Sequence, residues 1–111
     1  MSLSVLIRYR DGRPDYHNGF CHQSTLREFW WPLAERLSLP TLQRLEVLHV
    51  TQRVEALQLV SELRRVAEGF RSPGQLGEPK WASYILETLD RLIPVFEATL
   101  TEWEQVEYIS L

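Results

Sequence analysis

Both ends of this chain alternate apolar and polar residues with the period of a β-strand, whereas the long middle has the period of an α-helix. The strand-like segments are residues 3–9 and 105–111. A strand leaves its backbone N–H and C=O groups unpaired unless a neighbour supplies partners, so we expect the two ends to share one small sheet. The sequence therefore predicts an α+β fold that is predominantly helical, with about four helices packed on a small sheet that contains the N- and C-terminal strands.

The first strand has one apolar face that we expect to point into the core. This face carries Leu3, Val5, Ile7 and Tyr9. Residues 11–15 are rich in turn formers, and residues 16–20 either return as a short edge strand or remain a loop. In the last strand the buried pair is either Val106 and Tyr108 or Ile109 and Leu111, depending on its phase.

Four helices are expected: from about Ser24, from Thr41 to His49, from Thr51 to Phe70, and from about Lys80 to Trp103. Thr25 and Glu28 have the spacing of a capping box, which places the start of the first helix near Ser24. Pro32 removes a helical N–H and predicts a kink or a break.

The third predicted helix has the clearest division between a core face and a solvated face. Its apolar residues fall within about 120° of arc, and they are Ala56, Leu59, Val60, Leu63, Val66, Ala67 and Phe70. Its opposite side is expected to be solvated and carries Arg53, Glu62, Arg64, Arg65 and Glu68. Gly69 is well placed as a C-cap, and residues 71–79 are expected to form a loop.

The last predicted helix is apolar over about 200° of its circumference, which requires partners on two sides. It is either the central helix of the domain or part of an oligomer interface, and a bend is expected at Pro94.

Composition favours one globular domain over residues 1–111 and disfavours several classes of function. The formal net charge is −3 and only one of the 12 basic residues is Lys, which argues against a nucleic-acid binder. The single Cys21 is typical of a reducing compartment. No signal peptide and no apolar run of membrane-spanning length is evident, so we expect a cytoplasmic, bacterial protein that does not bind membranes.

The nearest approach to a catalytic or metal-binding cluster is His17, Cys21 and His22, with His49 later in the chain. Zinc sites usually present paired ligands at short spacings, and no second pair is present here. If the segment is extended, Cys21 and His22 point to opposite sides. We therefore predict no catalytic residue, no metal ligand and no cofactor.

Aromatic and acidic residues suggest an interaction surface instead. Trp31 lies outside the core stripe of its helix, so it either packs locally or anchors a partner. Trp81 and Tyr84 flank the apolar face of the last helix. Four acidic residues near the end of the chain either pair with arginines near its start, as cross-strand contacts, or form an acidic patch for a basic partner: Glu97, Glu102, Glu104 and Glu107.

These features favour a non-enzymatic protein-binding module of the immunity or accessory type, with a protein partner and a weak preference for a homodimer through Trp31 or the Trp81 and Tyr84 flank. The alternative is a small enzyme or a ligand- or metal-binding domain that uses the region of His17, Cys21 and His22.

Overall fold

The computed structural model of this chain describes residues 2–71 and 79–111, and at residues 71 and 79–82 it describes the backbone only. Within these ranges four α-helices pack on a four-stranded antiparallel sheet, which confirms the predicted α+β fold. The strands are β1 (Ser2–Tyr9), β2 (Tyr16–His22), β3 (His49–Val50) and β4 (Val106–Ser110). The α-helices are α1 (Gln23–Thr25), α2 (Trp31–Arg36), α3 (Arg53–Arg71) and α4 (Pro79–Thr101). Shorter helical segments are the π-helical turn η1 (Leu26–Trp30) and the 3₁₀ segments η2 (Leu42–Val47) and η3 (Trp103–Gln105).

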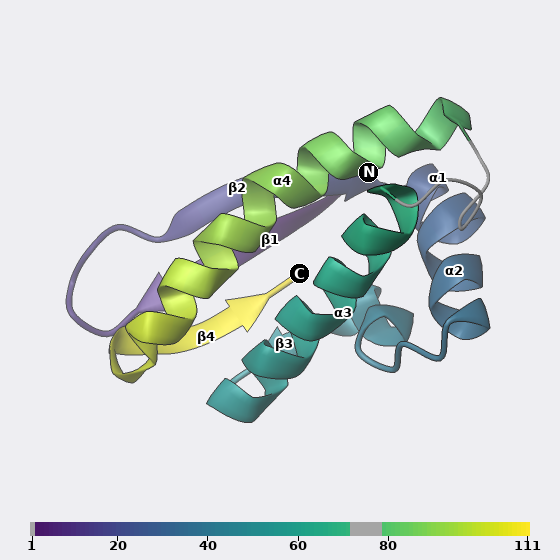
Figure 1. Cartoon of the computed structure of the whole chain (residues 1–111). Coiled ribbons are helices and arrows are strands. Elements are labelled where there is room, and N and C mark those ends of the chain that lie inside the picture. The colour runs from purple at the N-terminus through teal and green to yellow at the C-terminus, as the bar shows by residue number, and fades with distance from the viewer. Residues whose placement is uncertain (1, 72–78) are drawn as a thin grey trace.

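The two ends of the chain pair with each other, as predicted. The strand order is β2-β1-β4-β3, so β1 lies between the returning strand β2 and the distant strand β4 (Figure 1). Residues 16–20 belong to β2, which settles the predicted alternative in favour of a hairpin with β1. Backbone groups on both edges of β1 therefore have strand partners.

A β-bulge lies on each side of β1, and the two bulges explain which residues are buried. Between β1 and β2 the register shifts at Leu3/Ser4, and both Phe20 and Cys21 turn into the core. Between β1 and β4 it shifts at Arg8/Tyr9. Val106 and Ile109 are consequently both buried although they belong to opposite phases of an ideal strand.

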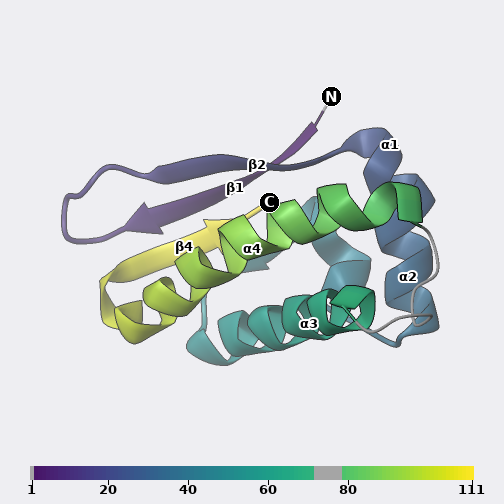
Figure 2. The ribbon, with the colours of Figure 1, turned by 45° about the horizontal axis from the view of Figure 1, so that its top comes forward.

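The helices α3 and α4 lie side by side on one face of the sheet, and α1 and α2 stand at one end of it (Figure 2). The core forms between these layers. On α4 the fully buried side chains are Ile85, Leu89, Leu92 and Phe96. Its wide apolar arc is largely covered within the chain, because the sheet packs on one side and α3 on the other, and Tyr84 is the only large apolar side chain exposed on its described part. The helix continues through Pro94 to Thr101.

The predicted capping box does not form. The helical segment begins at Gln23, directly after β2, with His22 as its N-cap and no side-chain hydrogen bond at that position. Thr25 already has helical backbone angles and its side chain is buried. An N-cap requires extended backbone angles, so the hydroxyl of Thr25 lies one turn too late for that role.

The interruption predicted at Pro32 takes the form of a π-helical turn. Pro32 lies at the start of α2, and immediately before it the backbone N–H of Trp31 donates to the carbonyl of Leu26, five residues back. Proline is tolerated in the first turn of a helix because its missing N–H has no partner there. The chain therefore stays helical from residue 23 to residue 36.

Other predicted boundaries are wrong in part. The second predicted helix shortens to the 3₁₀ segment η2, and His49 belongs to β3 instead. Gly69 is not a C-cap, because α3 continues to Arg71. The predicted loop at residues 71–79 falls mostly outside the described residues.

Glu62 is buried and not solvated, which is the main correction to the predicted solvated face of α3. It is 2% exposed. Its carboxylate accepts the backbone N–H groups of Thr41 and Leu42 at 3.2 and 3.0 Å, and the side-chain amide of Gln58 at 2.7 Å. The two backbone donors lie at the start of η2, where N–H groups have no partner within the helix. Glu62 therefore joins α3 to η2 by charge-assisted hydrogen bonds.

Deletion of residues 105–111 is expected to abolish cooperative unfolding. The deletion leaves one edge of β1 and the whole of β3 without strand partners and exposes apolar surface that Val106 and Ile109 cover. Thermal unfolding followed by circular dichroism checks this expectation. An unchanged melting temperature would contradict it.

Replacement of Glu62 by Gln is expected to lower the free energy of unfolding by about 1–3 kcal/mol, because hydrogen bonds to a charged acceptor are lost and one buried donor is left without an acceptor. Glu68→Gln is the matched control, since Glu68 is exposed on the same helix, and it should change stability by less than about 0.5 kcal/mol. Urea denaturation measures both values, and equal losses for the two variants would refute the structural role of Glu62.

Candidate functional site

The structure separates His17 from Cys21 and His22 along β2. In the register with β1, His17 lies opposite Leu6, whereas Cys21 lies opposite Leu3 and His22 opposite Ser2. Both histidines are exposed, but Cys21 is buried in the core. Among the described residues no group of three or more His, Cys, Asp or Glu side chains is placed to share a metal ion. These three residues therefore do not converge on one site.

Cys21 has the environment of a structural thiol. Burial raises its pKa to about 11, because the apolar surroundings disfavour the thiolate. A nucleophilic or metal-ligating cysteine requires the thiolate near neutral pH. The burial of Cys21 and its raised pKa both argue against a nucleophile at this position.

A small hollow of about 260 Å³ lies between the end of β2 and α4, next to Cys21. Tyr84, which is 39% exposed, lines it together with Thr88 and Arg91 of α4 and with His22. Its volume is below the range of about 300–1,000 Å³ that is typical of pockets for small organic ligands. Tyr84, which was proposed from sequence as an interface residue, therefore lies where α4 meets the end of β2.

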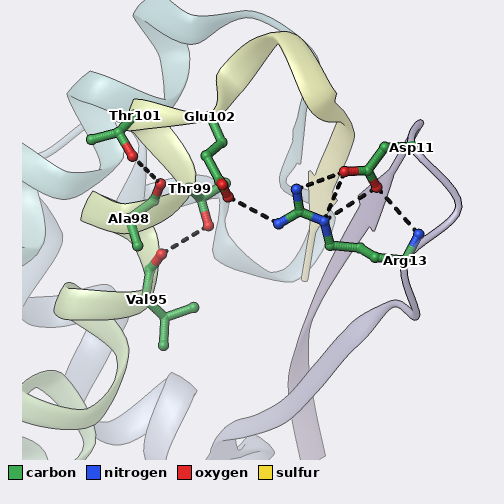
Figure 3. A network of polar contacts seen from close by, with 7 residues as sticks. All are labelled: Asp11, Arg13, Val95, Ala98, Thr99, Thr101 and Glu102. Atoms are coloured by element: carbon green, nitrogen blue, oxygen red, sulfur yellow. Dashed lines mark hydrogen bonds and ion pairs between the residues drawn. The ribbon is translucent and has the colours of Figure 1, made fainter.

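Three of the four acidic residues proposed as a patch are paired with arginines of the same chain, and one of these pairs joins Glu97 to Arg64 of α3. The guanidinium of Arg13 lies between Asp11 and Glu102, at 2.6 and 2.9 Å (Figure 3). Arg8 pairs with Glu107 at 3.2 Å across the β1–β4 bulge. Pairing was one of the two alternatives for these carboxylates, and it lowers the charge that they present to a partner.

Glu104 is exposed and has no ion pair among the described residues. It is thus the member of the proposed patch whose charge is left for a partner. Arg13 has a third contact besides its two carboxylate partners, because its guanidinium carbon lies 4.4 Å from the centre of the Tyr9 ring.

Of the two tryptophans proposed as interface anchors, the structure describes the side chain of Trp31. Trp31 is half-buried against the core, and its indole N–H is buried without an acceptor among the residues that the structure describes. The side chain of Trp81 lies outside the described residues. A role of either tryptophan at an interface stays a prediction.

The largest hollow among those found in the described part of the molecule is a groove between α3 and α4, with a volume of about 940 Å³. We call it the α3–α4 groove. Its lining comprises Val54, Leu57, Gln58, Val60, Ser61, Arg64, Arg65 and Glu68 of α3, and Glu97, Leu100 and Thr101 of the C-terminal part of α4. Val54 is 66% exposed and Leu57 is 41% exposed. Val54 and Leu57, which are large apolar side chains exposed to solvent, therefore lie in a concave surface.

Charges on the rim of the groove are partly neutralised. Arg64 pairs with Glu97 across the seam between the two helices. Arg65 lines the same groove, and no ion pair in the described part of the chain joins it to a carboxylate. Its guanidinium is therefore a positive group at the edge of an apolar hollow.

The α3–α4 groove was missed from sequence, although a signal was present. Val54 and Leu57 lie outside the core stripe of α3, on the side that was expected to be solvated. The periodicity shows that they are not core residues, but it does not show that α4 passes close enough to form the second wall. Single exposed apolar residues are common on surfaces and carry little information by themselves.

The comparisons with protein-family models, curated proteins and solved structures find no match for this chain. Within residues 2–71 and 79–111, no helix has both the length and the apolar character that crossing a membrane requires.

Cys21 is expected to resist alkylation and disulfide exchange in the folded protein. At pH 8 a pKa of about 11, compared with the ordinary value of 9.0, lowers the thiolate fraction about a hundredfold. Reaction with a chromogenic disulfide, with and without urea, measures the rate for the folded and unfolded chain. Rapid reaction of the folded chain would revive the alternative in which Cys21 is a nucleophile.

Proposed function

We propose that this chain is a non-enzymatic protein-binding module and that the α3–α4 groove is its binding surface. The observation that carries the proposal is the placement of Val54 and Leu57, which are exposed and yet lie within the largest concavity described. Exposed apolar side chains in a concave surface, with charged residues beside them, are typical of a protein–protein interface.

The occupant that we propose is an amphipathic helix of a partner protein. Val54, Leu57 and Ser61 recur along α3 with the spacing of one helix face, and the small side chain of Ser61 allows close approach of another backbone. A seam between two antiparallel helices accepts a third helix by packing ridges into grooves. Arg65 favours a carboxylate on the polar flank of that helix, because the neighbouring Arg64 already has Glu97 as a partner.

The role that we propose for such a module is that of an immunity or accessory protein in the bacterial cytoplasm. The alternative of an enzyme or metal-binding domain at His17, Cys21 and His22 receives no support from the geometry, because His17 lies apart from the other two residues along β2 and burial disfavours the thiolate of Cys21. Homodimer formation stays a prediction, and a second copy is the competing occupant of the groove.

A photo-crosslinking residue at position 61, used in cells that make this protein, tests the proposal. A covalent adduct with one partner protein is expected, and mass spectrometry then locates the crosslink on that partner. A crosslink in a predicted amphipathic helix supports the proposed occupant. An adduct only with a second copy of this chain, or no adduct, would overturn it.

Val54→Asp is then expected to weaken binding of the identified partner at least about tenfold, because it places a charge among the apolar side chains that line the groove. Val47→Asp is the matched control, since Val47 is 76% exposed and does not line the groove. Titration calorimetry with the two purified proteins gives both dissociation constants. Equal effects of the two substitutions would exclude the α3–α4 groove as the binding surface.

A further inference from the structure

Another hollow, with a volume of about 340 Å³, lies where η2 and β3 meet the first half of α3. This volume falls within the range that is typical of pockets for small organic ligands. We call it the η2–α3 hollow. Its lining comprises Pro40, Thr41, Arg44, Leu48, Val50, Val54, Glu55 and Gln58.

The apolar part of this lining is suited to an aliphatic group. It contains four aliphatic side chains and no aromatic ring: Pro40, Leu48, Val50 and Val54. Leu48 and Val50 are buried, so the hollow reaches the edge of the core. An aliphatic group that contacts them removes apolar surface from water, which favours binding.

One positive and one negative side chain line the same hollow without pairing to each other. They are Arg44 of η2 and Glu55 of α3. Neither has an ion-pair partner within the described part of the chain. The carboxylate of Glu55 accepts only backbone N–H groups, those of Thr51 and Gln52, at 3.4 and 3.2 Å. Both charges are therefore available to a ligand.

Two uncharged polar side chains add hydrogen-bonding groups. Thr41 is 6% exposed, and its hydroxyl forms no hydrogen bond with another described residue. A largely buried hydroxyl without a partner is unfavourable, so an acceptor on a ligand would satisfy it. The side-chain amide of Gln58 donates to the buried carboxylate of Glu62 at 2.7 Å, which fixes the orientation of Gln58.

We propose that the η2–α3 hollow binds a free α-amino acid with an aliphatic side chain, such as leucine. In this arrangement Arg44 and the hydroxyl of Thr41 donate to the α-carboxylate, and Glu55 accepts from the α-ammonium group. The side chain of the ligand lies on Leu48 and Val50. A zwitterion fits because it brings both charges on one carbon, and each meets a group of opposite charge that has no ionic partner within the described residues.

This proposal does not depend on the proposed function. Arg44 and Glu55 lie outside the α3–α4 groove, although Val54 and Gln58 line both hollows. The failure of one proposal therefore leaves the other standing.

Titration of the isotopically labelled protein with leucine, followed by the amide resonances in NMR spectra, tests the proposal. Saturable shifts are expected at Leu48, Val50 and Gln58, which line the hollow. Three related compounds each lack one feature of leucine: glycine lacks the side chain, leucinamide the carboxylate and N-acetylleucine the ammonium group. Each is expected to bind at least about tenfold more weakly than leucine.

Two variants assign the charges. Arg44→Gln is expected to weaken leucine binding at least about tenfold and to leave the binding of leucinamide unchanged. Glu55→Gln keeps an oxygen acceptor at the start of α3, and it should weaken the binding of leucine but not that of N-acetylleucine. Arg27→Gln is the matched control, because Arg27 is exposed and does not line the hollow, and it should bind leucine as the wild type does.

The absence of saturable shifts at millimolar leucine, or shifts confined to another face of the molecule, would overturn the proposal. Binding of leucinamide or N-acetylleucine as tight as that of leucine would also overturn it, because a zwitterion would then not be recognised. These comparisons use the unchanged protein, so they decide the outcome even if a variant fails to fold.

Discussion

The fold depends on backbone pairing along both edges of β1. Its buried face, with Leu3, Val5 and Ile7, forms the centre of the layer on which α3 and α4 pack. One edge pairs with β2 through a short turn, and the other pairs with β4 from the far end of the chain. Because β3 pairs with β4 alone among the described strands, half of the sheet is attached through this second edge.

Secondary structure and core were largely predictable from sequence wherever one strong periodicity acted alone. The third helix is the clearest case, because Leu59, Leu63 and Val66 are buried as their spacing predicts. The pairing of the chain ends followed from the need of each strand for a partner. Which residues of the last strand are buried could not be predicted, because a bulge combines Val106 and Ile109 from two phases.

Glu62 shows why polar residues on a helix are harder to place. Periodicity assigns it to the polar side of α3, and it does lie beside the core stripe. Its burial depends on the start of η2 reaching it with two backbone N–H groups, which is a tertiary contact between residues about twenty positions apart. Sequence periodicity has no information about this approach. The same limit applies to Gly69, which continues a helix that its residue type suggested would end there.

The candidate sites, too, could be predicted from sequence only in part. Sequence showed that His17 and Cys21 lacked matching ligands, and it gave the pairing of acidic residues with arginines as one alternative. The α3–α4 groove could not be seen, because a concavity belongs to two helices and not to either one. Val54 and Leu57 line a groove because Leu100 of α4 lies on its other wall, and this contact between helices is not visible in the sequence of α3.

The pairing of β1 with β4 also has a consequence for the order in which the chain can fold during synthesis. Arg10 and Val106, which are joined by a hydrogen bond at the end of this ladder, lie 96 residues apart. The hairpin of β1 and β2 and all of α3 emerge from the ribosome long before β4 is made, so one edge of the central strand stays open throughout that time. Contacts of such long range also slow the final folding step. A nascent chain of this protein is therefore exposed to wrong strand pairing at this edge until β4 emerges and pairs with it.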